Sequence, residues 1–86
     1  MTKVINKIKE RLQEVEDNEL YRPQEIEDIG VILNTKQEAS KYTIYRLIKN
    51  GELEALNLNS GGVKPKYFIK GKDLKEFVKK RYKITN

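Results

Sequence analysis

Long hydrogen-bond donors gather on one side of the segment from Lys41 to Lys49. Arginine, lysine and tyrosine side chains extend well beyond the backbone and donate hydrogen bonds to phosphate oxygens and to acceptors on base edges. In a helix, the positions that hold these donors lie opposite the apolar positions of the same segment. The pattern predicts a helical surface that binds a polyanion through five residues: Lys41, Tyr42, Tyr45, Arg46 and Lys49. Ser40, just before them, is a further candidate for this contact.

A second group of candidate ligand-binding residues lies in the segment 59–66. It contains two consecutive glycines, which allow the backbone to approach a ligand closely, and two lysines that follow them. Backbone N–H groups and lysines commonly contact nucleic-acid phosphates. The alternative interpretation is a plain hairpin turn, because Asn and Gly serve turns without any ligand. The candidate residues are Asn59, Ser60, Gly61, Gly62, Lys64 and Lys66.

The chain contains no cysteine and no histidine. A disulfide framework and a cysteine-based zinc site are therefore excluded, and the commonest general base and soft nucleophile are absent. No spacing of the carboxylates indicates a converged catalytic set. We expect a protein that is not an enzyme and that uses no cofactor and no metal ion.

Charge is distributed unevenly along the 86 residues, which have 18 Lys and Arg against 13 Asp and Glu and a net charge of +5. Segment 21–35 is acidic, whereas 36–53 and 64–66 are basic. A polyanion is the simplest partner for such a charge distribution, although lysines can also merely solvate a terminal helix. The C-terminal cations are Lys70, Lys72, Lys75, Lys79, Lys80, Arg81 and Lys83.

Length and hydropathy limit the class of protein further. A chain of 86 residues has room for one small domain with a thin core, since 37% of its residues are hydrophobic and 36% are charged. The longest apolar runs, such as 30–33, are far too short to cross a bilayer, and the start of the chain lacks a signal-type apolar region. We expect a cytoplasmic protein that does not contact a membrane.

The N-terminal segment 1–15 has apolar residues at alternating spacings of four and three, which is a heptad pattern and predicts a helix. The seam has to cover another surface, either the chain's own domain or a second copy. Val4 widens the apolar stripe and favours packing within the chain. The seam consists of Met1 with four residues that are also candidates for a dimer contact: Ile5, Ile8, Leu12 and Val15.

Two further helices are expected before the middle of the chain ends. Pro23 suits a first helical turn, and helical spacing extends to Leu33, with Ile26, Ile29 and Leu33 expected to be buried. The start of the next helix is ambiguous, because Thr35 with Glu38 forms a capping-box pattern and Ser40 is an equally good cap. We favour the start at Ser40.

The end of that helix and the elements after it follow from turn signals. Asn50 and Gly51 are typical of a left-handed helix end. Segments 53–58 and 66–69 are expected to form a hairpin that packs on the helices through Leu56, Leu58 and either Phe68 or Ile69. A last amphipathic helix follows, with a stripe of Leu74, Phe77, Val78, Arg81 and Tyr82.

This order predicts a mainly α fold with a small β-hairpin, namely a winged helix-turn-helix over residues 21–82. An extra amphipathic helix precedes it in residues 1–20, and a short tail, 83–86, follows. In such an arrangement the second helix of the pair fits the major groove of DNA, and the ribbon tip reaches the neighbouring backbone.

Three segments resemble the excisionase-like, MerR-type winged helix-turn-helix domains: Pro-Gln-Glu-Ile at 23–26, Thr-Ile-Tyr-Arg-Leu-Ile-Lys-Asn-Gly-Glu-Leu-Glu-Ala at 43–55, and Lys-Asp-Leu-Lys-Glu-Phe at 72–77. The resemblance covers roughly Tyr21 to Lys80. It implies that Thr43, Tyr45 and Arg46 face DNA. The chain departs from the family pattern in its longer connection from Gly30 to Ser40 and in its first twenty residues.

The sequence therefore predicts a double-stranded DNA-binding protein, either excisionase-like or a small transcriptional regulator of a mobile element, acting as a homodimer. The alternative is an accessory module in which the wing and the N-terminal helix recruit a recombinase, replication or partition protein. Neither the DNA sequence nor the biological process follows from the residues.

Overall fold

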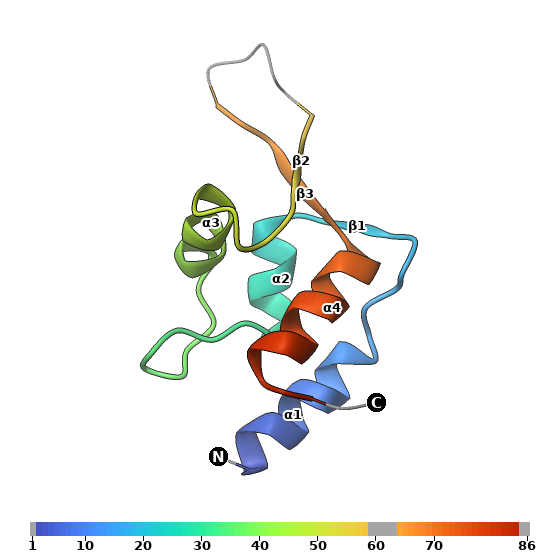
Figure 1. Cartoon of the computed structure of the whole chain (residues 1–86), viewed down its shortest axis with the longest axis vertical. Coiled ribbons are helices and arrows are strands. Elements are labelled where there is room, and N and C mark those ends of the chain that lie inside the picture. The colour runs from blue at the N-terminus through green and yellow to red at the C-terminus, as the bar shows by residue number, and fades with distance from the viewer. Residues whose placement is uncertain (1, 59–63, 85–86) are drawn as a thin grey trace.

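Four helices and three short strands make up residues 2–58 and 64–84, which are the part of the chain that this computed structural model describes. Figure 1 shows how they are arranged in one small mixed α/β domain. In chain order the elements are α1 (Thr2–Leu12), β1 (Leu20–Tyr21), α2 (Pro23–Ile29), α3 (Lys41–Lys49), β2 (Leu56–Asn57), β3 (Tyr67–Lys70) and α4 (Gly71–Arg81).

The sheet is antiparallel and has the strand order β1-β3-β2. The hairpin of β2 and β3 was expected, with Leu56 opposite Phe68. Strand β1 was not predicted; it places Leu20 opposite Lys70 on the other edge of β3. Two residues are too short for a period-2 pattern, so β1 exists because the backbone finds a partner in β3 and not because of its composition.

The two faces of this sheet differ in what they contact. Ile69 on β3 is fully buried, and Tyr21 opposite it packs against the core. Alternation along the strands places a second set of side chains on the opposite side, away from the core. We call this the outer face; it consists of Leu20, Leu56, Leu58, Phe68 and Lys70.

The expectation that Leu56 and Leu58 pack on the helices is wrong. Their side chains are 51% and 62% exposed, whereas Ile69 fills the position beneath the sheet. The physical reason is the register, since Leu56 stands opposite Phe68 and therefore shares its outward direction.

Helix α1 packs within its own chain. Ile8, Leu12 and Val15 are at most 6% exposed, and Ile5 is half-buried against the same core. The apolar seam of α1 is therefore covered by the chain's own domain. Because these side chains are buried, little apolar surface is left on α1 for a dimer contact. Its last turn holds Arg11, whose guanidinium donates a hydrogen bond of 3.1 Å to the carbonyl of Gly30.

Helix α2 ends earlier than predicted, at Ile29 instead of Leu33. Gly30 has a φ of 79° and its N–H donates to the carbonyl of Ile26, so this glycine ends the helix in the left-handed conformation. Because the chain leaves the helix here, Val31 and Ile32 are buried, while Ile29 and Leu33 are only half-buried.

Helix α4 begins where the backbone of segment 16–19 accepts its first N–H groups. The N–H of Gly71 donates to the carbonyl of Glu19 at 2.8 Å, and that of Lys72 donates to the carbonyl of Asp17 at 3.2 Å. A Cβ at Gly71 would overlap the carbonyl group of Glu16. The close approach of these two backbones therefore requires glycine at this position.

One core joins all four helices and the central strand. Ile84, which we expected in a tail, belongs to it: it is 8% exposed, and its N–H donates to the carbonyl of Lys79. The buried hydrophobic residues are Ile8, Leu12, Val15, Ile26, Val31, Ile32, Ile44, Leu47, Leu53, Ile69, Leu74, Val78 and Ile84.

Candidate nucleic-acid interface

Helix α3 starts and ends as the sequence predicts. Ser40 has extended backbone angles, and its hydroxyl accepts a hydrogen bond of 3.3 Å from the N–H of Tyr42. The alternative start after Thr35 is wrong, since Thr35 lies exposed in the preceding connection. At the other end, Gly51 has a φ of 78° and its N–H donates to the carbonyl of Ile48.

The outward side of α3 displays the predicted donors. Tyr42 is 75% exposed, Arg46 and Lys49 are exposed, and Lys41 and Tyr45 are half-buried. All five of these candidate residues therefore lie on the solvent side of one short helix, and the ammonium group of Lys41 lies 5.8 Å from the centre of the Tyr42 ring.

Thr43 does not share this surface. The resemblance implied that Thr43 faces DNA, but its side chain is only 6% exposed. Positions 43 and 47 lie one turn apart on the same side of the helix, and Leu47 is in the core. Thr43 therefore faces inward with Leu47, and the implied role of its side chain in DNA contact is wrong for this fold.

The N-terminus of α3 is held by a carboxylate from α2. The side chain of Glu27 accepts a hydrogen bond of 2.6 Å from the backbone N–H of Lys41. With the Ser40 cap, two of the first N–H groups of α3 already have partners inside the chain. Contacts of Ser40 and Lys41 with a ligand would therefore involve the lysine side chain in preference to the helix terminus.

The long connection between α2 and α3 has its own ordered structure. The side-chain oxygen of Asn34 accepts hydrogen bonds from the N–H groups of Lys36 and Glu38, and Leu33 pairs with Ala39 in an isolated bridge. These bonds close the connection into a compact turn. The connection is long, yet it is closed by local hydrogen bonds.

The end of α4 fixes this connection to the body of the protein. The Tyr82 hydroxyl accepts a hydrogen bond of 2.9 Å from the N–H of Leu33, and the Arg81 guanidinium donates one of 3.2 Å to the carbonyl of Leu33. The N–H and the carbonyl of Leu33 thus both have hydrogen-bond partners, one in the last residue of α4 and one in the residue that follows it. The direction in which α3 begins is therefore set by α2 and α4 together.

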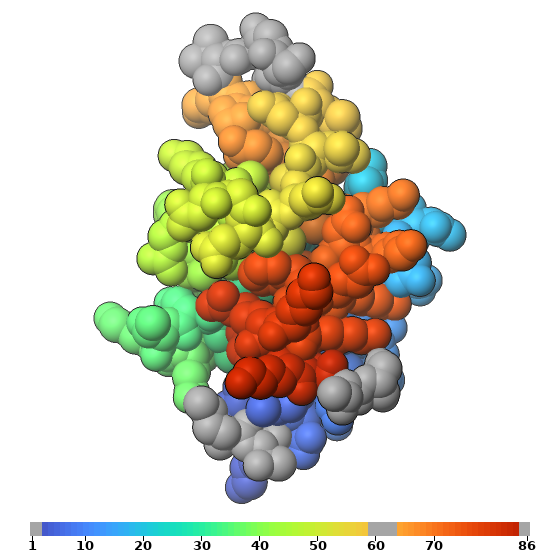
Figure 2. Space-filling model, in the orientation of Figure 1, coloured from blue at the N-terminus to red at the C-terminus, as the bar shows by residue number. Residues whose placement is uncertain are grey.

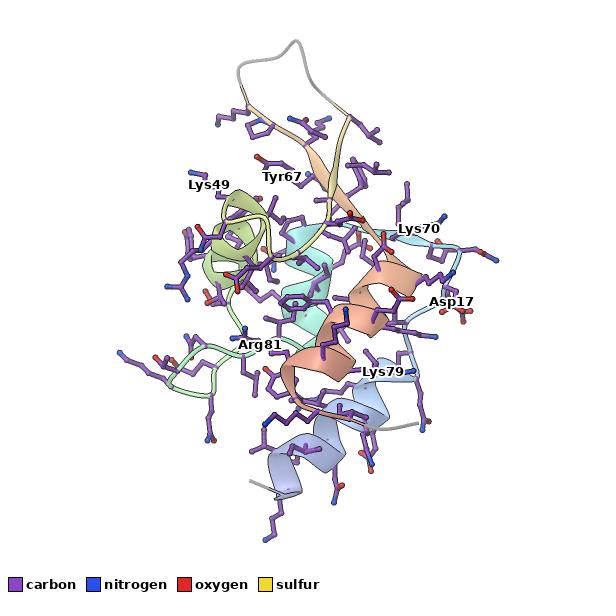
Figure 3. The ribbon with its side chains drawn as sticks, in the orientation of Figure 1. Asp17, Lys49, Tyr67, Lys70, Lys79 and Arg81 are labelled. Atoms are coloured by element: carbon purple, nitrogen blue, oxygen red, sulfur yellow. The ribbon has the colours of Figure 1, made fainter. Side chains whose placement is uncertain are left out.

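A tyrosine pair connects α3 with strand β3. The rings of Tyr45 and Tyr67 lie 6.1 Å apart between centroids and are tilted by 58°. Figure 3 shows Lys49 and Tyr67 toward the same end of the molecule, on these neighbouring elements. Tyr67 is not among the residues that the sequence predicts to bind a ligand. The available signal is its position two residues before the buried Ile69, which places both side chains on one side of the strand.

The ribbon formed by β2 and β3 extends beyond α3, as Figure 1 shows. Lys64 and Lys66 are exposed near its end, and the N–H of Lys66 donates to the side chain of Asn57. Four of the predicted ligand-binding residues lie outside the described part of the chain: Asn59, Ser60, Gly61 and Gly62.

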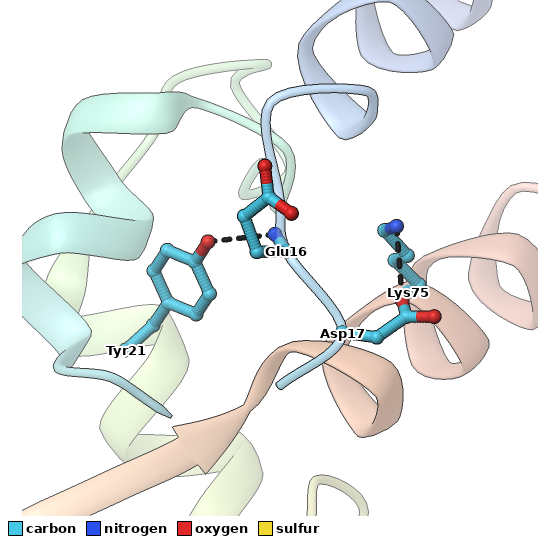
Figure 4. Close-up of polar contacts among 4 residues, drawn as sticks. All are labelled: Glu16, Asp17, Tyr21 and Lys75. Atoms are coloured by element: carbon cyan, nitrogen blue, oxygen red, sulfur yellow. Dashed lines mark hydrogen bonds and ion pairs between the residues drawn. The ribbon is translucent and has the colours of Figure 1, made fainter. Parts of the chain in front are cut away.

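The cations of α4 have a different environment from those of α3. The Lys75 ammonium group lies 2.9 Å from the Asp17 carboxylate, as Figure 4 shows beside the hydrogen bond from the Glu16 N–H to the Tyr21 hydroxyl. The hydrogen bond and the charge of Lys75 lower the pKa of Asp17 below its ordinary value of 3.8. Lys75 therefore joins α4 to segment 16–19.

Residues 2–58 and 64–84 contain neither a metal-binding cluster nor a membrane-spanning helix. No cluster of acidic side chains in these ranges could bind a metal ion. None of the helices described here has the length and apolar character needed to span a membrane.

Comparison with known proteins gives no relative: no family model matches the chain, and no curated protein or solved structure matches it either. The resemblance to winged helix-turn-helix domains thus rests on the three quoted segments alone.

Proposed function

We propose that this chain is a double-stranded DNA-binding protein of the winged helix-turn-helix type, excisionase-like or a small transcriptional regulator. The observation that supports this most is the solvent side of α3, where Tyr42, Arg46 and Lys49 are exposed on a helix fixed at its start by Glu27. A rigid helix with outward donors is the element that reads base edges in the major groove.

The dimensions of α3 suit this role. Nine residues at about 1.5 Å per residue give a helix about 14 Å long, and the major groove is about 12 Å wide. Arg46 lies in the middle of the outward side and has the fork of donors that recognises guanine. Lys49 lies one turn from Tyr45, where an ammonium group reaches a phosphate.

The ribbon serves as the wing in this proposal. The Tyr45–Tyr67 contact holds its base against α3, so that a duplex bound along α3 passes near the ribbon. Lys66 is exposed there and supplies a cation for the phosphate backbone. The two surfaces then contact adjacent parts of one duplex, the first with sequence preference and the second without it.

The test begins with selection of bound sequences from a random pool of duplexes, followed by titration of the selected site and a random duplex at two salt concentrations. Arg46→Ala should weaken binding to the selected site by about 1–3 kcal/mol and relax the preference for it. Lys66→Ala should weaken binding to both duplexes equally and reduce the salt slope by about one. Absence of binding to any duplex would refute the proposal.

A further inference from the structure

The outer face of the sheet exposes apolar side chains that nothing in the described chain covers. Four large hydrophobic residues are exposed in the described ranges, and three of them, Leu20, Leu56 and Leu58, are 41%, 51% and 62% exposed on this one face. Phe68 lies among them and is half-buried. Single exposed hydrophobics are common on soluble proteins, but a group on one face indicates an interaction surface.

A hollow of about 310 Å³ opens on this face beside the start of α4. Leu56, Ala55 and Phe68 give it an apolar lining, and its charged residues are Glu54, Lys70 and Asp73. Figure 2 shows residues of β2 against β3 and the start of α4 on the side of the molecule facing the reader. Figure 3 labels Lys70 where β3 meets α4. The surface is therefore apolar at its centre with charges of both signs around it.

This surface is distinct from the outward side of α3. Tyr67, which contacts Tyr45 on α3, points to the opposite side of β3 from Phe68 and Lys70, because successive side chains alternate along a strand. The outer face therefore does not overlap the outward side of α3, although Lys66, which stands opposite Leu58, points to the same side as the outer face.

We propose that a second copy of this chain binds the outer face, in a symmetric dimer whose two-fold axis passes near the hollow. A two-fold interface uses the same patch on both copies, so the patch has to be complementary to itself. Glu54 and Lys70 meet this condition, because Glu54 of each copy can face Lys70 of the other copy across the axis. In the described part of the chain, these two side chains form no ion pair with one another.

In this proposal the dimer contact lies on the outer face of the sheet and not on the N-terminal helix, where the heptad pattern had suggested it. Ile8 and Leu12 are inside the chain's own core, whereas Leu56 and Leu58 are available. The apolar patch is small, so the dimer is weak. Both copies keep α3 turned away from the interface. The inference concerns self-association alone and does not depend on DNA binding.

The first test is sedimentation of the full chain over a range from micromolar to millimolar concentration. The wild-type chain should shift from monomer to dimer, and Leu56→Asp should remain monomeric throughout. Tyr42→Asp is the matched control, because it replaces the other large exposed hydrophobic residue, which lies on α3. The control should dimerise like the wild-type chain. A wild-type chain that stays monomeric, or equal losses in both variants, would overturn the proposal.

The second test distinguishes a second copy from any other partner. Lys70→Glu and Glu54→Lys should each dimerise at least tenfold more weakly than the wild-type chain, because like charges then meet across the axis. An equimolar mixture of the two variants should regain association, since opposite charges face each other in the mixed dimer. Both positions are exposed, so the fold should persist. A mixture that associates no better than the single variants contradicts the two-fold contact and indicates a different occupant.

Discussion

Helices α3 and α4 are both amphipathic and basic, yet their cations have different surroundings. On α3, Arg46 and Lys49 are exposed and point into solvent. On α4, Lys75 pairs with Asp17, and Arg81 donates to the backbone of the connection that precedes α3. The sequence gives α4 more cations than α3, but α4 also carries Asp73 and Glu76, and part of its positive charge holds the domain together.

The comparison shows that the number of cations on a helix does not identify a ligand-binding surface. A cation with an internal partner contributes to the fold, whereas an exposed cation on a fixed helix is available to a ligand. In this chain α4 also determines where α3 begins, since Tyr82 and Arg81 bind both polar groups of Leu33. Substitutions at the contacts of α4 should therefore lower the free energy of unfolding, and substitutions on the outward side of α3 should leave it unchanged.

The largest effect on stability is expected at the start of α4. Gly71→Ala places a methyl group against the carbonyl of Glu16, so the two backbones must separate and the hydrogen bond to Glu19 must lengthen. We expect a loss of about 1–3 kcal/mol or more in the free energy of unfolding, measured by denaturant titration. Lys72→Ala, at the exposed neighbouring position, should change it by less than about 0.5 kcal/mol. Equal effects of the two substitutions would contradict the close approach.

A smaller loss is expected at the other end of α4. Tyr82→Phe removes the acceptor of the Leu33 N–H and leaves that group without its partner, which should cost about 1–2 kcal/mol in unfolding free energy. The matched substitution on α3 is Tyr42→Phe, which also removes one hydroxyl but from an exposed ring. It should be neutral within about 0.5 kcal/mol. Thermal unfolding of both variants compares the two helices directly. If Tyr82→Phe proved neutral, the Tyr82 hydroxyl would not stabilise the connection before α3.

The smallest effect concerns pH. Because the folded state lowers the pKa of Asp17, the stabilisation from its pair with Lys75 is present above the ordinary value of 3.8 and is lost as the pH falls through the lowered value. Thermal midpoints measured from pH 6 downward should converge for the wild-type chain and Asp17→Asn at acid pH. The pair is exposed, so the difference at pH 6 should be small. A difference that grows on acidification would reverse the assigned sign.

Some elements follow directly from local sequence signals. Ser40 and Gly51 mark the two ends of α3, and both act through interactions within a few residues, which explains why their positions were predicted correctly. The pairing of β2 with β3 and the position of α4 also follow from periodicity. These signals are encoded in neighbouring residues and need no knowledge of distant contacts.

Other features depend on contacts between distant parts of the chain. Strand β1 has two residues and exists through pairing with β3, and the outward direction of Leu56 follows from its register with Phe68. The bond between Glu27 and Lys41 joins residues from two helices, so no local pattern indicates it. Thr43 was assigned to the DNA surface by resemblance, and the helical position it shares with Leu47 excludes this.

The most direct test of the central claim compares two exposed lysines, each in the last turn of its helix: Lys49 on α3 and Lys80 on α4. Lys49→Ala and Lys80→Ala remove the same charge, so a loss of affinity caused by net charge alone would be equal in both variants. Titrated by fluorescence anisotropy against the selected duplex, Lys49→Ala should bind several-fold more weakly than the wild-type chain, and Lys80→Ala should bind as the wild-type chain does. Equal weakening of both variants would contradict the account, because it would show that net charge and not the outward side of α3 binds DNA.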